Sequence, residues 1–159
     1  MKKIYFVLLL GLLASCKEHH HDEHSHAKVK LILDEKAISI DFSTHSGAII
    51  GFEHSARSEQ DKKTQDSKLK AFEENINQMF KIEQSCNAKK QNITIEKDGH
   101  HAIFRAIIQI NCIKSLKSND LQFNIKSFYP EISELEVETI KNGEAKTHEI
   151  NANGGKFKL

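Results

Sequence analysis

The sequence predicts an α+β fold, an antiparallel sheet of about six or seven strands with one main helix packed on a face. Apolar and polar residues alternate in several stretches, and this period of two is typical of half-buried strands. A stretch that begins near residue 58 instead has apolar residues three and four apart, the spacing of one helix face. Two pairs of the alternating stretches flank short turns, so we expect them to form antiparallel hairpins.

The first fifteen residues have the pattern of a secretory signal peptide. Two lysines follow the initial methionine, and residues 4–13 are an apolar stretch. That stretch is too short for a permanent membrane helix, which needs about 20 residues. It ends in Leu13-Ala14-Ser15-Cys16, which resembles the lipobox of bacterial lipoproteins. The resemblance implies cleavage before Cys16 and lipidation of that cysteine, and the alternative is an ordinary signal peptide with a chance cysteine beside the cut.

The remaining chain is long enough for one domain and nearly neutral. Removing residues 1–15 leaves 144 residues (159 minus 15), which suffices for a modest core. Two lysines leave with the signal, so the formal net charge changes from +1 to −1. This balance argues against nucleic acid as a partner, which requires a concentrated basic patch. No basic amphipathic helix is predicted, so we expect contact with a membrane only through the lipid anchor.

Residues 16–27 are expected to be a lipidated cysteine followed by a His-rich tether. A segment this polar cannot bury enough surface to fold alone. We therefore expect a single α+β domain over residues 28–159. Its first two strands are predicted to form a hairpin within residues 28–44, around Asp34-Glu35-Lys36. Residues 46–54 follow as an apolar turn or a short helix.

The main helix is predicted to begin at Ser58, with Asp61 three residues later, and to run for about twenty residues. Its apolar stripe consists of Leu69, Phe72, Ile76 and Met79. Strand patterns then resume around residues 93–95, before an Asp98-Gly99 turn.

The strand over residues 102–112 is apolar at every second position, and Cys112 belongs to this apolar set. We expect Cys112 to face the core and His101 to face away from it. Another strand is predicted over residues 121–125. A last hairpin is expected over residues 134–150, because Asn142-Gly143 is a strong hairpin signal.

Two cysteines remain besides Cys16. Export to an oxidising compartment makes a disulfide between Cys86 and Cys112 the favoured interpretation. Two buried free thiols, or two soft metal ligands, are the alternatives.

The residues before the domain are typical of a metal-binding tract. Between Glu18 and His26, eight of nine residues carry imidazole or carboxylate groups, which suit zinc and also copper or nickel. The alternatives are a solvated spacer or a leftover tag. A match to the H-x-x-E-H signature of metallopeptidases at His20–His24 is expected by chance in such a tract. Candidate ligands here are His19, His20, His21, Asp22, Glu23 and His24.

Several landmarks along the chain resemble the ZrgA family of zinc-regulated periplasmic proteins. The G-F-E-H segment ends at His54, an H-x-H pair ends at His26, and H-x-x-F begins at His101, ahead of Cys112. Phe128-x-Pro130, a closing hairpin and a terminal strand follow in the same order. The resemblance implies a zinc site formed by His24, His26, His54 and His101, with Glu53 as a neighbouring carboxylate. His100, which stands beside His101 in the sequence, is a secondary metal candidate.

The sequence and the resemblance together predict an envelope lipoprotein that faces the periplasm, captures zinc and delivers it to a zinc uptake system. Its expected partners are the zinc ion and envelope metal transporter components. A structural or adhesive lipoprotein with incidental histidines is the alternative. A metalloenzyme is less favoured, because no recognisable general base or nucleophile accompanies the metal-binding residues. We therefore expect no enzymatic activity.

Overall fold

The computed structural model describes residues 26–82, 86–99, 101–116, 120–141 and 144–159. The predicted lipidation site at Cys16, the His-rich tract up to His24, and His100 lie outside these residues. The described elements are β1 (His26–Leu33), β2 (Ala37–His45), α1 (Ser46–Ile50), α2 (Glu59–Met79), β3 (Phe80–Ile82), β4 (Cys86–Asp98), β5 (His101–Cys112), β6 (Asp120–Asn124), a 3-10 turn (Ile125–Ser127), β7 (Glu134–Lys141), β8 (Glu144–Asn151) and β9 (Asn153–Lys158).

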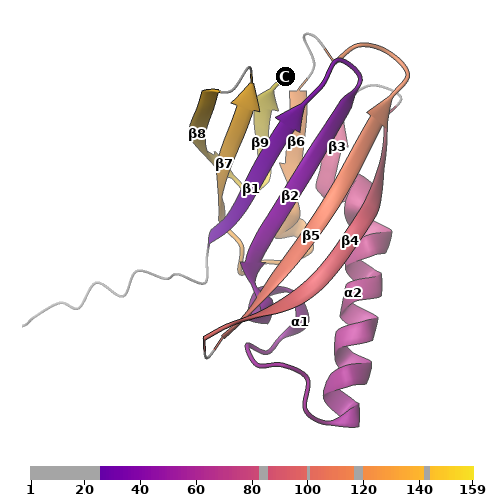
Figure 1. Cartoon of the computed structure of the whole chain (residues 1–159), viewed down its shortest axis with the longest axis vertical. Helices are drawn as coiled ribbons and strands as arrows, with labels where there is room; N and C mark the ends of the chain where they lie inside the picture. Colours follow the sequence, from indigo (N-terminus) through magenta and orange to yellow (C-terminus); the bar gives the residue numbers. More distant parts are fainter. Residues whose placement is uncertain (1–25, 83–85, 100, 117–119, 142–143) are drawn as a thin grey trace, which may run out of the picture.

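The larger sheet has six strands in the order β4-β5-β2-β1-β7-β8 (Figure 1). Both predicted hairpins, β1–β2 and β7–β8, are present and antiparallel. However, β1 and β7 are parallel neighbours, with Val29 opposite Val137. The prediction of a purely antiparallel sheet is therefore wrong, and this sheet is mixed.

The physical reason is that alternation identifies strands but not their neighbours. Both β1 and β7 bury every second side chain, which makes them equally good partners for antiparallel or parallel strands. A parallel pair needs a long crossover, and here the chain between β1 and β7 includes both helices and five other strands. No local turn signal marks such a connection.

A second sheet, of three strands in the order β3-β6-β9, was not predicted as a separate layer. β3 has three residues and follows α2 directly, so it is too short to show a period of two. It pairs with β6 through Phe80 and Phe123. The described chain thus contains two sheets and one long helix, with more strand than the predicted α+β arrangement.

The long helix α2 begins and packs as the sequence predicts. The Ser58 hydroxyl accepts a hydrogen bond from the Asp61 N–H at 3.0 Å, and the Asp61 carboxylate accepts one from the Ser58 N–H at 3.1 Å. The backbone N–H groups of Arg57 and Ser58 both donate to the Asp61 carboxylate and lower its pKa. Three members of the apolar stripe, Phe72, Ile76 and Met79, are buried. Among the described helices, none is both long and apolar enough to cross a membrane.

α2 and the three-stranded sheet lie on the same side of the six-stranded sheet (Figure 1). The core fills the space between these layers. Phe72 of α2 lies 4.6 Å from Phe104 of β5 and 5.8 Å from Phe42 of β2, measured between ring centres. None of the described helices and strands covers the opposite face of the six-stranded sheet (Figure 1).

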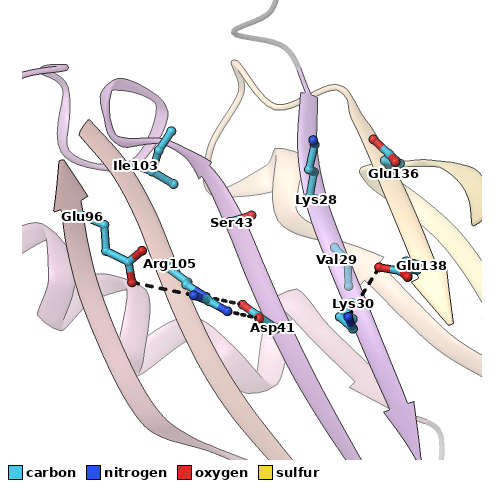
Figure 2. A pocket seen from close by; sticks show the side chains of 10 residues that line it. All are labelled: Lys28, Val29, Lys30, Asp41, Ser43, Glu96, Ile103, Arg105, Glu136 and Glu138. Carbon is cyan, nitrogen blue, oxygen red and sulfur yellow. Dashed lines mark hydrogen bonds and ion pairs between the residues drawn. The ribbon is translucent and has the colours of Figure 1, made fainter. Parts of the chain in front are cut away.

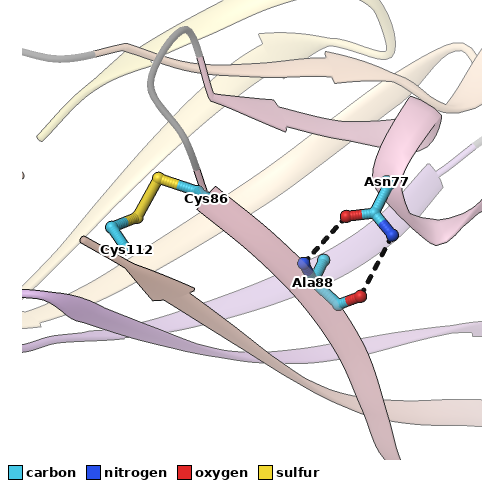
Figure 3. Close-up of a disulfide and its surroundings, with 4 residues drawn as sticks. All are labelled: Asn77, Cys86, Ala88 and Cys112. Atoms are coloured by element: carbon cyan, nitrogen blue, oxygen red, sulfur yellow. Dashed lines mark hydrogen bonds between the residues drawn. A yellow bond between two sulfur atoms is a disulfide. The ribbon is translucent and has the colours of Figure 1, made fainter.

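A disulfide joins Cys86 and Cys112, which face each other across β4 and β5 (Figure 3). This confirms the favoured interpretation of the two cysteines over free thiols or metal ligands. Nearby, the Asn77 side chain of α2 accepts a hydrogen bond from the Ala88 N–H at 2.8 Å and donates one to the Ala88 carbonyl at 3.1 Å. The helix is therefore attached to β4, an edge strand of the sheet, close to the disulfide.

Candidate metal site at one end of the sheet

The exposed face of the six-stranded sheet carries paired charges. Arg105 donates to both carboxylate oxygens of Asp41, with 2.8 Å between Nε and Oδ1, and it lies 3.9 Å from Glu96 (Figure 2). Asp41 raises the pKa of Arg105. Lys30 lies 3.8 Å from Glu138 across β1 and β7. These residues, together with Lys28 and Glu136, line a hollow of about 300 Å³ whose described charged groups are three cations and four carboxylates.

A larger hollow, of about 580 Å³, adjoins the first. The two share Lys28, Ser43, Ile103 and Glu136. The larger one is distinguished by three histidines, His26, His45 and His101, and by Asp98.

The strand pairing brings these histidines to the same end of the sheet. β1 begins at His26, β2 ends at His45 and β5 begins at His101, toward the bottom of Figure 1. Lys28 pairs with Ser43, so extending the register by two residues places His26 opposite His45. The Thr44 hydroxyl also donates to the His26 carbonyl at 3.2 Å. The rings of His45 and His101 are 6.0 Å apart and perpendicular.

A carboxylate lies beside Nδ1 of His26 and another lies beside Nδ1 of His101. Nδ1 of His101 lies 3.1 Å from Oε2 of Glu53, and Nδ1 of His26 lies 3.6 Å from Oε2 of Glu134. In metal sites, a ligating histidine commonly directs its second nitrogen to a carboxylate, which fixes the ring and leaves the other nitrogen for the metal. The same arrangement here leaves Nε2 of both rings available as a ligand.

The loop after α1 is shaped to present Glu53. Gly51 ends α1 in the left-handed conformation, with φ of 90°, which glycine adopts without steric cost. The Ser46 hydroxyl then donates to the Phe52 carbonyl at 2.7 Å and holds the returning chain against the start of the helix. This geometry gives the Gly-Phe-Glu part of the G-F-E-H motif a structural role in positioning the Glu53 carboxylate.

A model of ZrgA family zinc uptake proteins matches residues 18–159. The chain belongs to the ZrgA family. The match confirms the resemblance drawn from the motifs and assigns the chain a role in zinc uptake. It also includes the His-rich tract from residue 18 onward. No curated protein matches the chain.

The structure brings together only part of the ligand set implied by the ZrgA resemblance. His26 and His101 line the same hollow, and Glu53 contacts His101. His54 does not line the hollow. Its Nδ1 lies 3.0 Å from the Ser55 carbonyl oxygen, and its ring stacks on Phe52 at 4.9 Å. In their present positions, no three His, Cys, Asp or Glu side chains of the described residues are close enough to hold a metal ion.

The predictions from the ZrgA motifs missed three residues at this end of the sheet, His45, Asp98 and Glu134. His45 had a usable signal, because the predicted hairpin over residues 28–44 extends to a His26–His45 pair if its register is continued. Asp98 pairs with His101 in the β4–β5 hairpin, where the Asp98-Gly99 turn was predicted. Glu134 had no signal, since it reaches His26 only through the parallel β1–β7 pairing.

Proposed function

We propose that this ZrgA family member is a cell-envelope lipoprotein that captures zinc and delivers it to a zinc uptake system. The observation that supports this most directly is the meeting of His26 and His101 in one exposed hollow. They come from distant parts of the chain, and each has a carboxylate beside Nδ1. Imidazole nitrogens supported in this way are good zinc ligands.

The proposed zinc ligands are His24, His26, His54 and His101. His26 and His101 are held by strands, so little further ordering is needed when the metal binds. His24 precedes His26 by two residues in the sequence, and we propose it as a ligand of the same zinc ion. His54 follows Glu53 directly and is exposed, and its ring must leave its present contact with Phe52 to reach zinc. Glu53 orients His101 in this arrangement.

The proposed lipid anchor and the His-rich tract make the protein a capture device at a membrane surface. Cys16 would hold the chain to the membrane, and residues 18–26 lead directly into β1 and the hollow. A segment as polar as the tract is not expected to fold alone, and ordering each of its residues round a metal costs about 1–2 kcal/mol. We therefore expect the tract to bind zinc more weakly than the hollow does. Zinc collected by the tract would then pass to the tighter site beside it.

The test is a zinc titration of the protein exported to the envelope and purified in detergent. We expect one tight binding phase and several weaker ones. A His26→Ala/His101→Ala double variant should lose the tight phase, and a form without residues 17–23 should lose only weak phases. His148→Ala is the matched control, because His148 is exposed on β8 and contacts Phe157 outside the hollow. Loss of all zinc binding in the truncated form would overturn the proposed site in the hollow.

Delivery needs a separate measurement. Zinc uptake by zinc-starved cells should fall when the gene is deleted, and it should be restored by the wild-type protein. The His26→Ala/His101→Ala variant should not restore it. Mass spectrometry of the mature N-terminus tests the anchor, and an unacylated protein cut elsewhere would contradict it.

A further inference from the structure

We propose that His45 is a further zinc ligand, and that His26, His45 and His101 form a three-histidine site held by the fold. This inference rests on the proposed function, because it changes the ligand set of the zinc site described there. Zinc takes four ligands, so His45 would take the place of one of the four named above. Neither the G-F-E-H segment nor the other family landmarks include His45. The three rings line one hollow, which is the observation from which we start.

The first argument is the position of His45 on the sheet. Along β2, Asp41 and Ser43 point to the exposed face, and His45 is the next residue of this alternating set. Extending the β1–β2 register places His45 directly across from His26, and the Cβ atoms of such a pair are about 4.5–5.5 Å apart. His45 pairs with Ile103 of β5, two residues from His101, so it stands diagonal to that histidine.

The second argument compares ring separations. Zinc binds imidazole nitrogen at about 2.1 Å with tetrahedral angles, which puts the centres of two ligating rings about 5 Å apart. The ring centres of His45 and His101 are 6.0 Å apart. Side-chain rotations that bring the two ring centres about 1 Å closer would therefore suffice for both rings to bind one zinc ion. Since the backbone already supplies the spacing, the site needs no rearrangement of the strands.

The third argument concerns the groups around the rings. Glu134 and Glu53 lie beside Nδ1 of His26 and His101, so these rings would ligate zinc through Nε2. Asp98 and Glu136 add negative charge to the hollow, and Lys28 is the cation that lines it. Lys28 is directly opposite Glu136 in the β1–β7 register, which balances its charge.

A site with three nitrogen ligands from the fold has a functional consequence. With these three histidines bound, tetrahedral zinc keeps a fourth position for water or for a ligand from an acceptor. A ligand of the tract or of an acceptor can bind zinc at this fourth position while the three histidines still hold the ion. Zinc can then enter or leave by replacing one ligand at a time. His45 thus makes the hollow a strong site that can still release its metal.

The experiment measures zinc affinity by competition with a chelating dye, using the exported full-length protein and its His45→Ala and His45→Gln variants. Loss of an outer-shell partner of a metal ligand typically weakens binding 10–100-fold, so loss of a ligand should weaken it by at least about tenfold. His148→Ala is the control and should leave the affinity unchanged. A second measurement uses the wild-type protein alone. The ring nitrogen resonance of His45 should shift on addition of one equivalent of zinc, whether or not the variants fold.

The outcomes separate this inference from the proposed function. If the wild-type protein binds zinc tightly but the His45 variants bind it equally well, His45 is not a ligand. An unshifted His45 resonance would lead to the same conclusion, and the contact with His101 would then be ordinary aromatic packing. If the wild-type protein has no tight site, or keeps it in the His26→Ala/His101→Ala variant, the proposed zinc site itself is wrong.

Discussion

Removing the disulfide should lower stability without changing zinc binding. The bond between Cys86 and Cys112 spans a sequence separation of 26 and encloses nearly all of β4 and β5. The loop-entropy model gives about 3.5 kcal/mol for constraining a loop of this length in the unfolded state. Both cysteines also pack against the core. For a Cys86→Ala/Cys112→Ala variant we therefore expect the free energy of unfolding to fall by about 3 to 4 kcal/mol.

The assay is urea denaturation of the exported wild-type and double-variant proteins, followed by the loss of β-sheet signal. The urea concentration at half unfolding should be lower for the variant. The slope of the unfolding free energy against urea should be slightly steeper, because the unfolded chain becomes less compact. Zinc affinity of the folded variant is the internal control. Cys112 and His101 are at opposite ends of β5, about 36 Å apart at the usual rise per residue, so the tight phase should be unchanged.

Two results would refute this reasoning. A loss of stability below about 1 kcal/mol would mean that the β4–β5 hairpin remains ordered in the unfolded chain. A fall in zinc affinity of the folded variant would mean that the two ends of the sheet are coupled, contrary to the separation of the disulfide from the hollow.

Three further predictions concern stability and can be tested by denaturation of single variants. Asn77→Ala removes both hydrogen bonds to Ala88, and should lower the free energy of unfolding by about 1 to 3 kcal/mol, measured in urea. Gly155→Ala should destabilise by about 1 to 3 kcal/mol or more, shown by a lower thermal midpoint, because a Cβ there would overlap the Asn151 carbonyl and the Ile150 side chain. Burial raises the pKa of Tyr129 to about 12 from its usual value near 10, so its neutral form favours the folded state. That contribution is complete below about pH 10 and lost as the pH rises toward 12, and a Tyr129→Phe variant should lose less stability over this interval. Equal losses for both proteins would contradict this interpretation of Tyr129.

The parts of the fold that depend on local chemistry could be predicted from the sequence. The Ser58–Asp61 cap and the stripe through Phe72 define α2, because both depend on spacing within a few residues. The two hairpins follow for the same reason, since a turn fixes the pairing of the strands that it joins. The disulfide was deduced from the compartment and the number of cysteines, and the facing positions of Cys86 and Cys112 agree with it.

The parts that depend on long-range pairing could not be predicted. The parallel contact of β1 with β7 and the separate layer formed by β3, β6 and β9 result from the packing of the whole chain. Some residues of the candidate site likewise follow from local patterns in the sequence, and others depend on long-range pairing. His26 and His101 came from family motifs, and His45 could have been found by extending a predicted hairpin. The contact between Glu134 and His26 requires the parallel strand pairing, which no local pattern indicates.

The most direct test of the zinc site is a crystal structure of the protein grown with zinc, with the metal located by anomalous scattering at the zinc edge. We predict a zinc ion in the hollow, bonded to Nε2 of His26 and His101 at about 2.1 Å, with Glu53 and Glu134 beside the Nδ1 atoms. Zinc bound only by the tract before β1, with the hollow free of metal, would contradict the proposed site.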